Sequence, residues 1–129
     1  MRRIAYLLLP LALFASACAT QTASSVQTVS ANEIADVVAR PGVVTIDVRT
    51  PQEFASGHLE GAINIDLQAA DFKDRISALP TDGTYAVYCQ SGNRSATAVA
   101  QMAKMGFGDI YEMSGGIMAW QLEGLPIVH

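Results

Sequence analysis

Two short apolar runs, at residues 43–48 and 84–88, most constrain what this chain can fold into. Each has the length and the β-branched and aromatic content of a strand buried within a sheet. Two more strands are predicted at 62–65 and 110–113. Helical patterns separate them, at 31–40, from Pro51 onward, at 72–79, at 94–105 and at 117–122. This alternation predicts an α/β fold, with a parallel sheet covered by helices on both faces.

The first residues have the pattern of an export signal. Arg2 and Arg3 precede an apolar block at 4–15, and small residues follow it. The block is about half the ~20 residues that cross a bilayer, so residues 1–17 are predicted to be a cleaved signal peptide. With half of its 129 residues apolar, the remaining chain is long enough for one domain.

Cys18 directly follows the small residues. The stretch from Phe14 to Cys18 resembles a bacterial lipoprotein signal, although Ala15 stands where that pattern prefers Leu. Lipidation of Cys18 is favoured over simple secretion, because the alternative leaves an exposed thiol in an oxidising compartment. We expect a tether at 18–25, a domain at 26–129, and a periplasmic or cell-envelope location in which only the lipid anchor contacts the membrane.

Charge and cysteine content narrow the partners. Removal of residues 1–17 would leave 6 basic residues against 12 acidic ones, a net charge near −6. An acidic chain without a basic cluster argues against nucleic acid as a partner. If Cys18 is acylated, Cys89 has no cysteine partner, which leaves neither a disulfide nor a dithiol pair. There is no zinc-ligand spacing, and we expect a monomer without metal or cofactor.

Cys89 is the candidate nucleophile. It follows the 84–88 strand and precedes a short polar loop and a helix. The dipoles and free amides of a helix N-terminus favour a thiolate there, and Gly92 suits a bend with positive φ inside the loop. Asp47 and Arg49 follow another buried strand. Since parallel strands end at one edge of a sheet, these side chains can meet Cys89.

Three separated motifs resemble a single-domain rhodanese. They are Asp47-Val-Arg49 with Glu53-Phe54 and Gly57-His58-Leu-Glu-Gly61, then Cys89-Gln90-Ser91-Gly92-Asn93-Arg94-Ser95, then Gly115-Gly116 with Trp120 and Gly124-Leu-Pro126. The resemblance runs from about Val26 to Pro126. It implies three layers around a mostly parallel five-stranded sheet, and a sulfurtransferase whose Cys89 carries sulfane sulfur as a persulfide.

The resemblance also implies roles for the residues around Cys89. Residues Gln90 to Ser95 would surround the persulfide. Arg94 would either orient an anionic donor or pair with Glu53 or Asp47, and pairing is favoured because a cation that begins a helix needs an anion beside it. Asp47 and Arg49 are expected to tie the loop to the sheet edge. His58 is expected to be a hydrogen-bonded structural residue and not a general base.

Other functions remain open at this stage. Protein-phosphatase-like and arsenate-reductase-like enzymes also place a cysteine before an arginine, but their loop is one residue longer and surrounds a tetrahedral oxyanion. A non-catalytic interaction module tethered at the cell envelope is the main alternative. For an enzyme, the expected partners are a small sulfur donor such as thiosulfate and a thiol or other thiophilic acceptor, for example an envelope protein.

Overall fold

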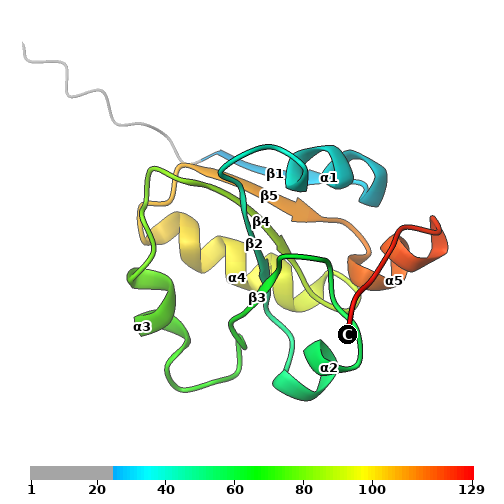
Figure 1. Cartoon of the computed structure of the whole chain (residues 1–129). Coiled ribbons are helices and arrows are strands. Elements are labelled where there is room, and N and C mark those ends of the chain that lie inside the picture. Colours follow the sequence, from blue (N-terminus) through cyan, green and yellow to red (C-terminus); the bar gives the residue numbers. More distant parts are fainter. Residues whose placement is uncertain (1–24) are drawn as a thin grey trace, which may run out of the picture.

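The computed structural model describes residues 25–129, which form a single sheet with helices around it (Figure 1). The strands are β1 (Ser25–Val29), β2 (Val44–Asp47), β3 (Ile63–Asn64), β4 (Thr84–Tyr88) and β5 (Asp109–Met113). The helices are α1 (Ala31–Val38), α2 (Pro51–Ala55), α3 (Phe72–Ser77), α4 (Asn93–Lys104) and α5 (Gly116–Leu122). All strand pairs are parallel, in the order β1-β5-β4-β2-β3. The predicted α/β fold with a five-stranded parallel sheet is confirmed.

Alternating residues of the strands build two cores, one on each face of the sheet. On one face, Tyr85, Val87 and Cys89 pack with residues of α3 and α4. On the other face, Ala86 and Tyr88 pack with residues of α1 and α5. Figure 1 shows α1 and α5 on one side of the strands and α3 and α4 on the other. Cys89 therefore belongs to the α4 face, which decides what can surround its sulfur.

The strand pattern of the sequence does not predict β1. This strand lies at the edge of the sheet and pairs from Ser25 opposite Asp109 to Val29 opposite Met113. Its first four residues are exposed, so the segment lacks the apolar run by which buried strands are recognised. Ser25, assigned above to the tether, is the first residue of β1.

The signal peptide at 1–17, the lipidation site Cys18 and the rest of the tether lie outside the described residues. Within residues 25–129, no helix combines the length and the apolar character needed to cross a membrane.

Candidate active site

The β4–α4 loop holds the sulfur of Cys89 against backbone amides. Cys89 directly follows β4, and Gly92 caps α4 with φ +104°, which confirms the positive φ expected there. The N–H of Gly92 donates to Sγ of Cys89 over 3.0 Å, and Oγ of Ser95 lies 3.4 Å from the same sulfur. The thiol thus stands at the N-terminus of a twelve-residue helix, as the sequence predicts.

The thiol of Cys89 is buried, which the sequence does not predict. Cys89 is only 1% exposed and forms part of the core cluster on the α4 face. Burial raises the pKa of the Cys89 thiol, whereas hydrogen bonds from the backbone amides of Ser95, Gly92 and Ser91 lower that pKa. The sulfur is therefore enclosed, yet faces groups that stabilise a negative charge.

Asp47 and Arg49 connect the end of β2 to the Cys89 loop. Nη2 of Arg49 lies 2.7 Å from Oδ2 of Asp47, and these side chains are 3% and 0% exposed. Arg49 also donates to the carbonyl of Gly57 at 2.7 Å and to Oε1 of Gln90 at 3.2 Å. Both residues tie the loop to the sheet edge, as expected, and neither contacts the sulfur.

Arg94 pairs with Glu53, one of the two acids proposed for it. Its Nη1 and Nη2 lie 2.7 and 2.8 Å from Oε2 and Oε1 of Glu53. Oε2 of Glu53 also accepts the N–H of Thr50 in the capping box that begins α2. This bidentate pair joins the first turns of α2 and α4, so the guanidinium is already bound to a carboxylate.

The Glu53–Arg94 pair makes stability depend on pH on the acid side. Arg94 holds the pKa of Glu53 at about 2, against an ordinary value of 4.5. A carboxyl with a depressed folded pKa contributes stability above its unfolded pKa and loses it as the pH falls toward the folded value. We expect the Tm of the wild type to fall more steeply from about pH 5 to about pH 3 than that of Glu53→Gln in thermal unfolding. Parallel curves of Tm against pH for the two proteins would contradict this expectation. The measurement is made at low salt, because Glu53 is 33% exposed and salt screens an exposed ion pair.

None of the remaining predicted site residues in the described part of the chain forms a side-chain hydrogen bond with the sulfur, which lies within hydrogen-bond distance of Ser95 and Gly92. Nδ1 of His58 is 2.8 Å from the carbonyl of Phe54, and the two rings stack with centroids 3.7 Å apart. These contacts match the structural role expected for His58. Ser91 in the loop and Asn93 at the start of α4 are exposed.

Glu112, which was missed in the sequence, and Gly116, which was noted there only within the third motif, complete the surroundings of Cys89. Oε1 of the buried Glu112 accepts the hydroxyl of Ser95 at 2.7 Å, so a carboxylate stands behind the residue next to the sulfur. A Cβ on Gly116 would lie 2.5 Å from the carbonyl oxygens of Cys89 and Gln90. The only signal for Glu112 is an acid inside the 110–113 strand.

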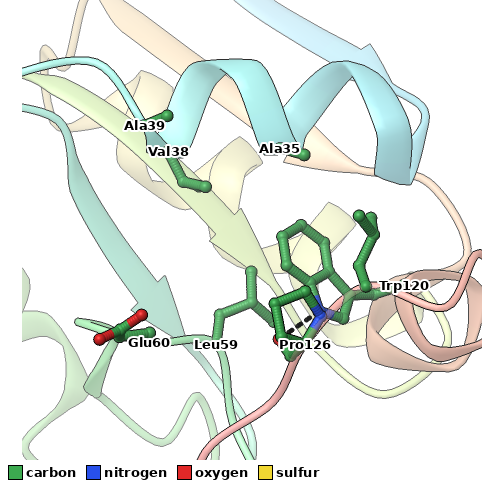
Figure 2. A pocket seen from close by; sticks show the side chains of 8 residues that line it. Ala35, Val38, Ala39, Leu59, Glu60, Trp120 and Pro126 are labelled. Carbon is green, nitrogen blue, oxygen red and sulfur yellow. Dashed lines mark hydrogen bonds between the residues drawn. The ribbon is translucent and has the colours of Figure 1, made fainter.

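A cavity of about 440 Å³ lies elsewhere, on the α1 face of the sheet (Figure 2). It is lined by Ala35, Val38, Ala39, Leu59, Glu60, Trp120, Leu125 and Pro126. Trp120 closes part of it and donates its indole N–H to the carbonyl of Pro126 at 2.9 Å. Because Cys89 packs in the core of the opposite face, this cavity is not the sulfur site. Within residues 25–129, no group of three or more His, Cys, Asp or Glu side chains is placed to hold a metal ion.

Comparison with known proteins agrees with this geometry. The model of the rhodanese-like domain matches residues 30–123. A sulfurtransferase of Allochromatium vinosum is 38% identical over 86 residues, 67% of this chain and 78% of that protein. The thiosulfate sulfurtransferase GlpE of Pseudomonas aeruginosa is 40% identical over 81 residues, 62% of this chain and 71% of that protein.

Solved structures show the same fold. The crystal structure of a rhodanese-related protein from Thermoplasma volcanium has a TM-score of 0.70 at 32% identity, covering 79% of this chain and 97% of that one. The rhodanese-like domain of an Anabaena protein has a TM-score of 0.71 at 26% identity, covering 78% of this chain and 77% of that one. By its fold, its cysteine loop and these relatives, the chain belongs to the family of rhodanese-like sulfurtransferases.

Proposed function

We propose that this protein transfers sulfane sulfur from a donor such as thiosulfate to a thiophilic acceptor through a persulfide on Cys89. The observation that carries the proposal is the position of Sγ, which accepts the N–H of Gly92 at 3.0 Å at the start of α4. Amides gathered at a helix N-terminus favour a thiolate and an anionic sulfur bound to it. The relatives named as sulfurtransferases support the same reaction.

The reaction proceeds in two displacements. The Cys89 thiolate attacks the outer sulfur of thiosulfate with its lone pair, a new S–S bond forms, and sulfite leaves with the electron pair of the broken S–S bond. An acceptor thiolate then attacks the terminal sulfur of the persulfide, and Cys89 leaves as a thiolate. No oxidant is consumed, and ping-pong kinetics are expected. Because Cys89 is 1% exposed, a donor reaches the sulfur only if the groups around it move.

Intact-mass analysis tests the proposal. After treatment with thiosulfate, the protein is expected to gain one sulfur atom, and cyanide is expected to remove it as thiocyanate. A protein that gains no sulfur under conditions where a known rhodanese is loaded would contradict the proposal. That result would support the non-catalytic module, which the near-complete burial of Cys89 favours.

Arg94→Ala is expected to lower kcat/KM for sulfur transfer at least tenfold, about 1.4 kcal/mol in the activation free energy. The change removes the bidentate pair with Glu53 and the positive charge that attracts a thiolate at Cys89. Steady-state transfer from thiosulfate to cyanide measures the effect. Arg75→Ala is the matched control, because Arg75 is an exposed arginine of α3 and lies outside the Cys89 loop. An unchanged kcat/KM in Arg94→Ala would show that the pair does not support the reaction.

We also propose that the domain works outside the cytoplasm, attached through a lipid on Cys18. The proposal rests on the apolar block at 4–15 and the small residues before Cys18. Labelled fatty acid is expected to be incorporated into the wild type and not into Cys18→Ser. Release of an unlabelled, shortened wild-type protein would instead indicate simple secretion.

We further propose that the protein is a monomer and that a thiol protein of the cell envelope accepts its sulfur. Trapping the sulfur recipient in an envelope lysate tests the acceptor.

A further inference from the structure

A buried carboxylate stands behind the residue that contacts the Cys89 sulfur. Glu112 lies in β5 and is 4% exposed. Oε1 of Glu112 accepts the hydroxyl of Ser95 at 2.7 Å, and Oε2 accepts the hydroxyl of Thr28 at 2.9 Å. Two hydroxyl donors, one on each oxygen, suit an ionised carboxylate, which can only accept. Within residues 25–129, both ion pairs use other acids, so the charge of Glu112 has no cation paired with it.

The hydroxyl of Ser95 has one hydrogen and several acceptors around it. Oγ of Ser95 lies 2.7 Å from Oε1 of Glu112, 3.2 Å from the carbonyl of Gly92 and 3.4 Å from Sγ of Cys89. A charged acceptor at the shortest distance takes the hydrogen. A lone pair of Ser95 then faces the sulfur. That lone pair can accept the S–H of a thiol, but it repels the negative charge of a thiolate.

We propose that Glu112, acting through Ser95, is a positioning residue that disfavours negative charge on Sγ and thereby favours the sulfur-loaded form of Cys89. The proposal rests on the persulfide chemistry proposed above. In the free thiolate the charge lies on Sγ. When the thiolate lone pair forms the new S–S bond and the leaving group departs with the electrons of the old one, the charge moves to the terminal sulfur, one bond of about 2 Å further out. Sγ becomes neutral, and its repulsion with Ser95 and Glu112 is relieved.

Other charged groups near the sulfur are unchanged by a substitution at Glu112. Arg94, at the start of α4, attracts a thiolate at Cys89. Glu53 on α2 binds Arg94, while Asp47 at the end of β2 binds Arg49. In the sheet, Glu112 itself lies opposite Thr28 of β1 and Val87 of β4, neither of which titrates. Glu112→Gln therefore removes one charge from an otherwise constant surrounding.

The first test is the pH dependence of Cys89 alkylation by iodoacetamide, followed on the Cys89 peptide by mass spectrometry so that Cys18 does not interfere. In Glu112→Gln, the side chain keeps its shape, and its amide can donate to Ser95, which frees the Ser95 hydrogen for Sγ. We expect the midpoint of the rate profile to fall by about one pH unit, a tenfold gain in thiolate at low pH. Glu112→Asp keeps the charge and is expected to shift the midpoint less than Glu112→Gln.

An unchanged or raised midpoint in Glu112→Gln would overturn the proposal. The midpoint would stay unchanged if Glu112 had only a structural role, and the substitution would raise it if Glu112 accepted the proton of the thiol. The Ser95→Ala background separates the path through the hydroxyl from direct repulsion. In the Ser95→Ala background, Glu112→Gln is expected to shift the midpoint by less than half as much as in the wild type. An equal shift would contradict a role through Ser95.

If Glu112→Gln does not fold, infrared difference spectra of the wild type against Cys89→Ser test whether the Cys89 thiol donates to Ser95. The S–H band is expected at the frequency of a hydrogen-bonded thiol and at that of a free thiol in Ser95→Ala.

The second test is the loading equilibrium in mixtures of thiosulfate and sulfite, measured by intact mass at a pH above the alkylation midpoints of both proteins, where free Cys89 is a thiolate. Glu112→Gln is expected to lower the ratio of persulfide to free protein about tenfold, matching the change in thiolate stability. An unchanged ratio would contradict a preference for the loaded form. A wild type that never gains sulfur would refute the proposed function, while the alkylation profiles would still report on Glu112.

Discussion

Cys89→Ser is expected to abolish sulfur uptake from thiosulfate and transfer to cyanide while leaving the fold unchanged. A serine hydroxyl is a far weaker nucleophile at neutral pH than a thiolate, and among residues 25–129 Cys89 is the only free cysteine. Intact mass and steady-state kinetics measure the loss, which should exceed the range of either assay. Cys18→Ser is the matched control and is expected to keep the wild-type kcat/KM.

The fold should survive Cys89→Ser because the hydroxyl can replace the sulfur as acceptor of the Gly92 N–H. The substitution puts a hydroxyl into the core cluster on the α4 face, which is expected to cost about 1 kcal/mol in the free energy of unfolding. Denaturant unfolding measures this cost. Residual transfer in a folded Cys89→Ser protein would remove Cys89 as the nucleophile. If Cys89→Ser does not fold, Cys89→Ala, which introduces no polar group, tests whether Cys89 is the nucleophile.

Gly116→Ala is expected to lower the free energy of unfolding by about 3 kcal/mol and to reduce sulfur transfer more than tenfold. Gly116 has φ +60°, and a Cβ there would lie 2.5 Å from the carbonyl oxygens of Cys89 and Gln90. These atoms are backbone and cannot rotate away. In the wild type, the N–H groups of Ile117 and Met118 donate to the same carbonyls at 2.9 and 3.2 Å. The methyl group would thus push the start of α5 off the Cys89 loop.

Gly42→Ala is the control that separates this contact from backbone strain. Gly42 has φ +82°, but nothing lies within 4 Å of a Cβ built on it. Its substitution is expected to cost about 1 kcal/mol, the usual penalty for a left-handed alanine, without loss of transfer. Equal effects at Gly42 and Gly116 in urea unfolding would contradict a specific clash. A stable, active Gly116→Ala would show that α5 can shift without disturbing Cys89.

Local sequence patterns were sufficient for the buried elements of the fold. The β2 and β4 strands are apolar runs because both of their faces are covered, and Ser30 with Glu33 forms the capping box that begins α1. β1 was not predictable in this way, since its partner β5 lies about eighty residues later and its own residues face solvent. An edge strand of this kind is defined by its neighbour more than by its composition.

In the site, local pattern predicted the parts that lie within one turn of Cys89. The thiol after a strand, the bend at Gly92 and the following helix are all present. The sequence predicted that Arg94 pairs with Glu53 or Asp47. The pair with Glu53 forms because α2 packs beside the start of α4. The near-complete burial of Cys89 could not be foreseen, because it depends on side chains from other segments packing over the sulfur.

The sequence alone determined the order of the helices and of strands β2 to β5, and it singled out Cys89 as the candidate nucleophile within a family motif, because these features depend on near neighbours along the chain. Only the tertiary structure decided that Glu112 stands behind Ser95 and that Gly116 closes on the Cys89 backbone. Those contacts join residues 17 and more positions apart in the chain. Such pairs are set by how β5 and α5 pack beside β4 and α4, and no local pattern records that packing.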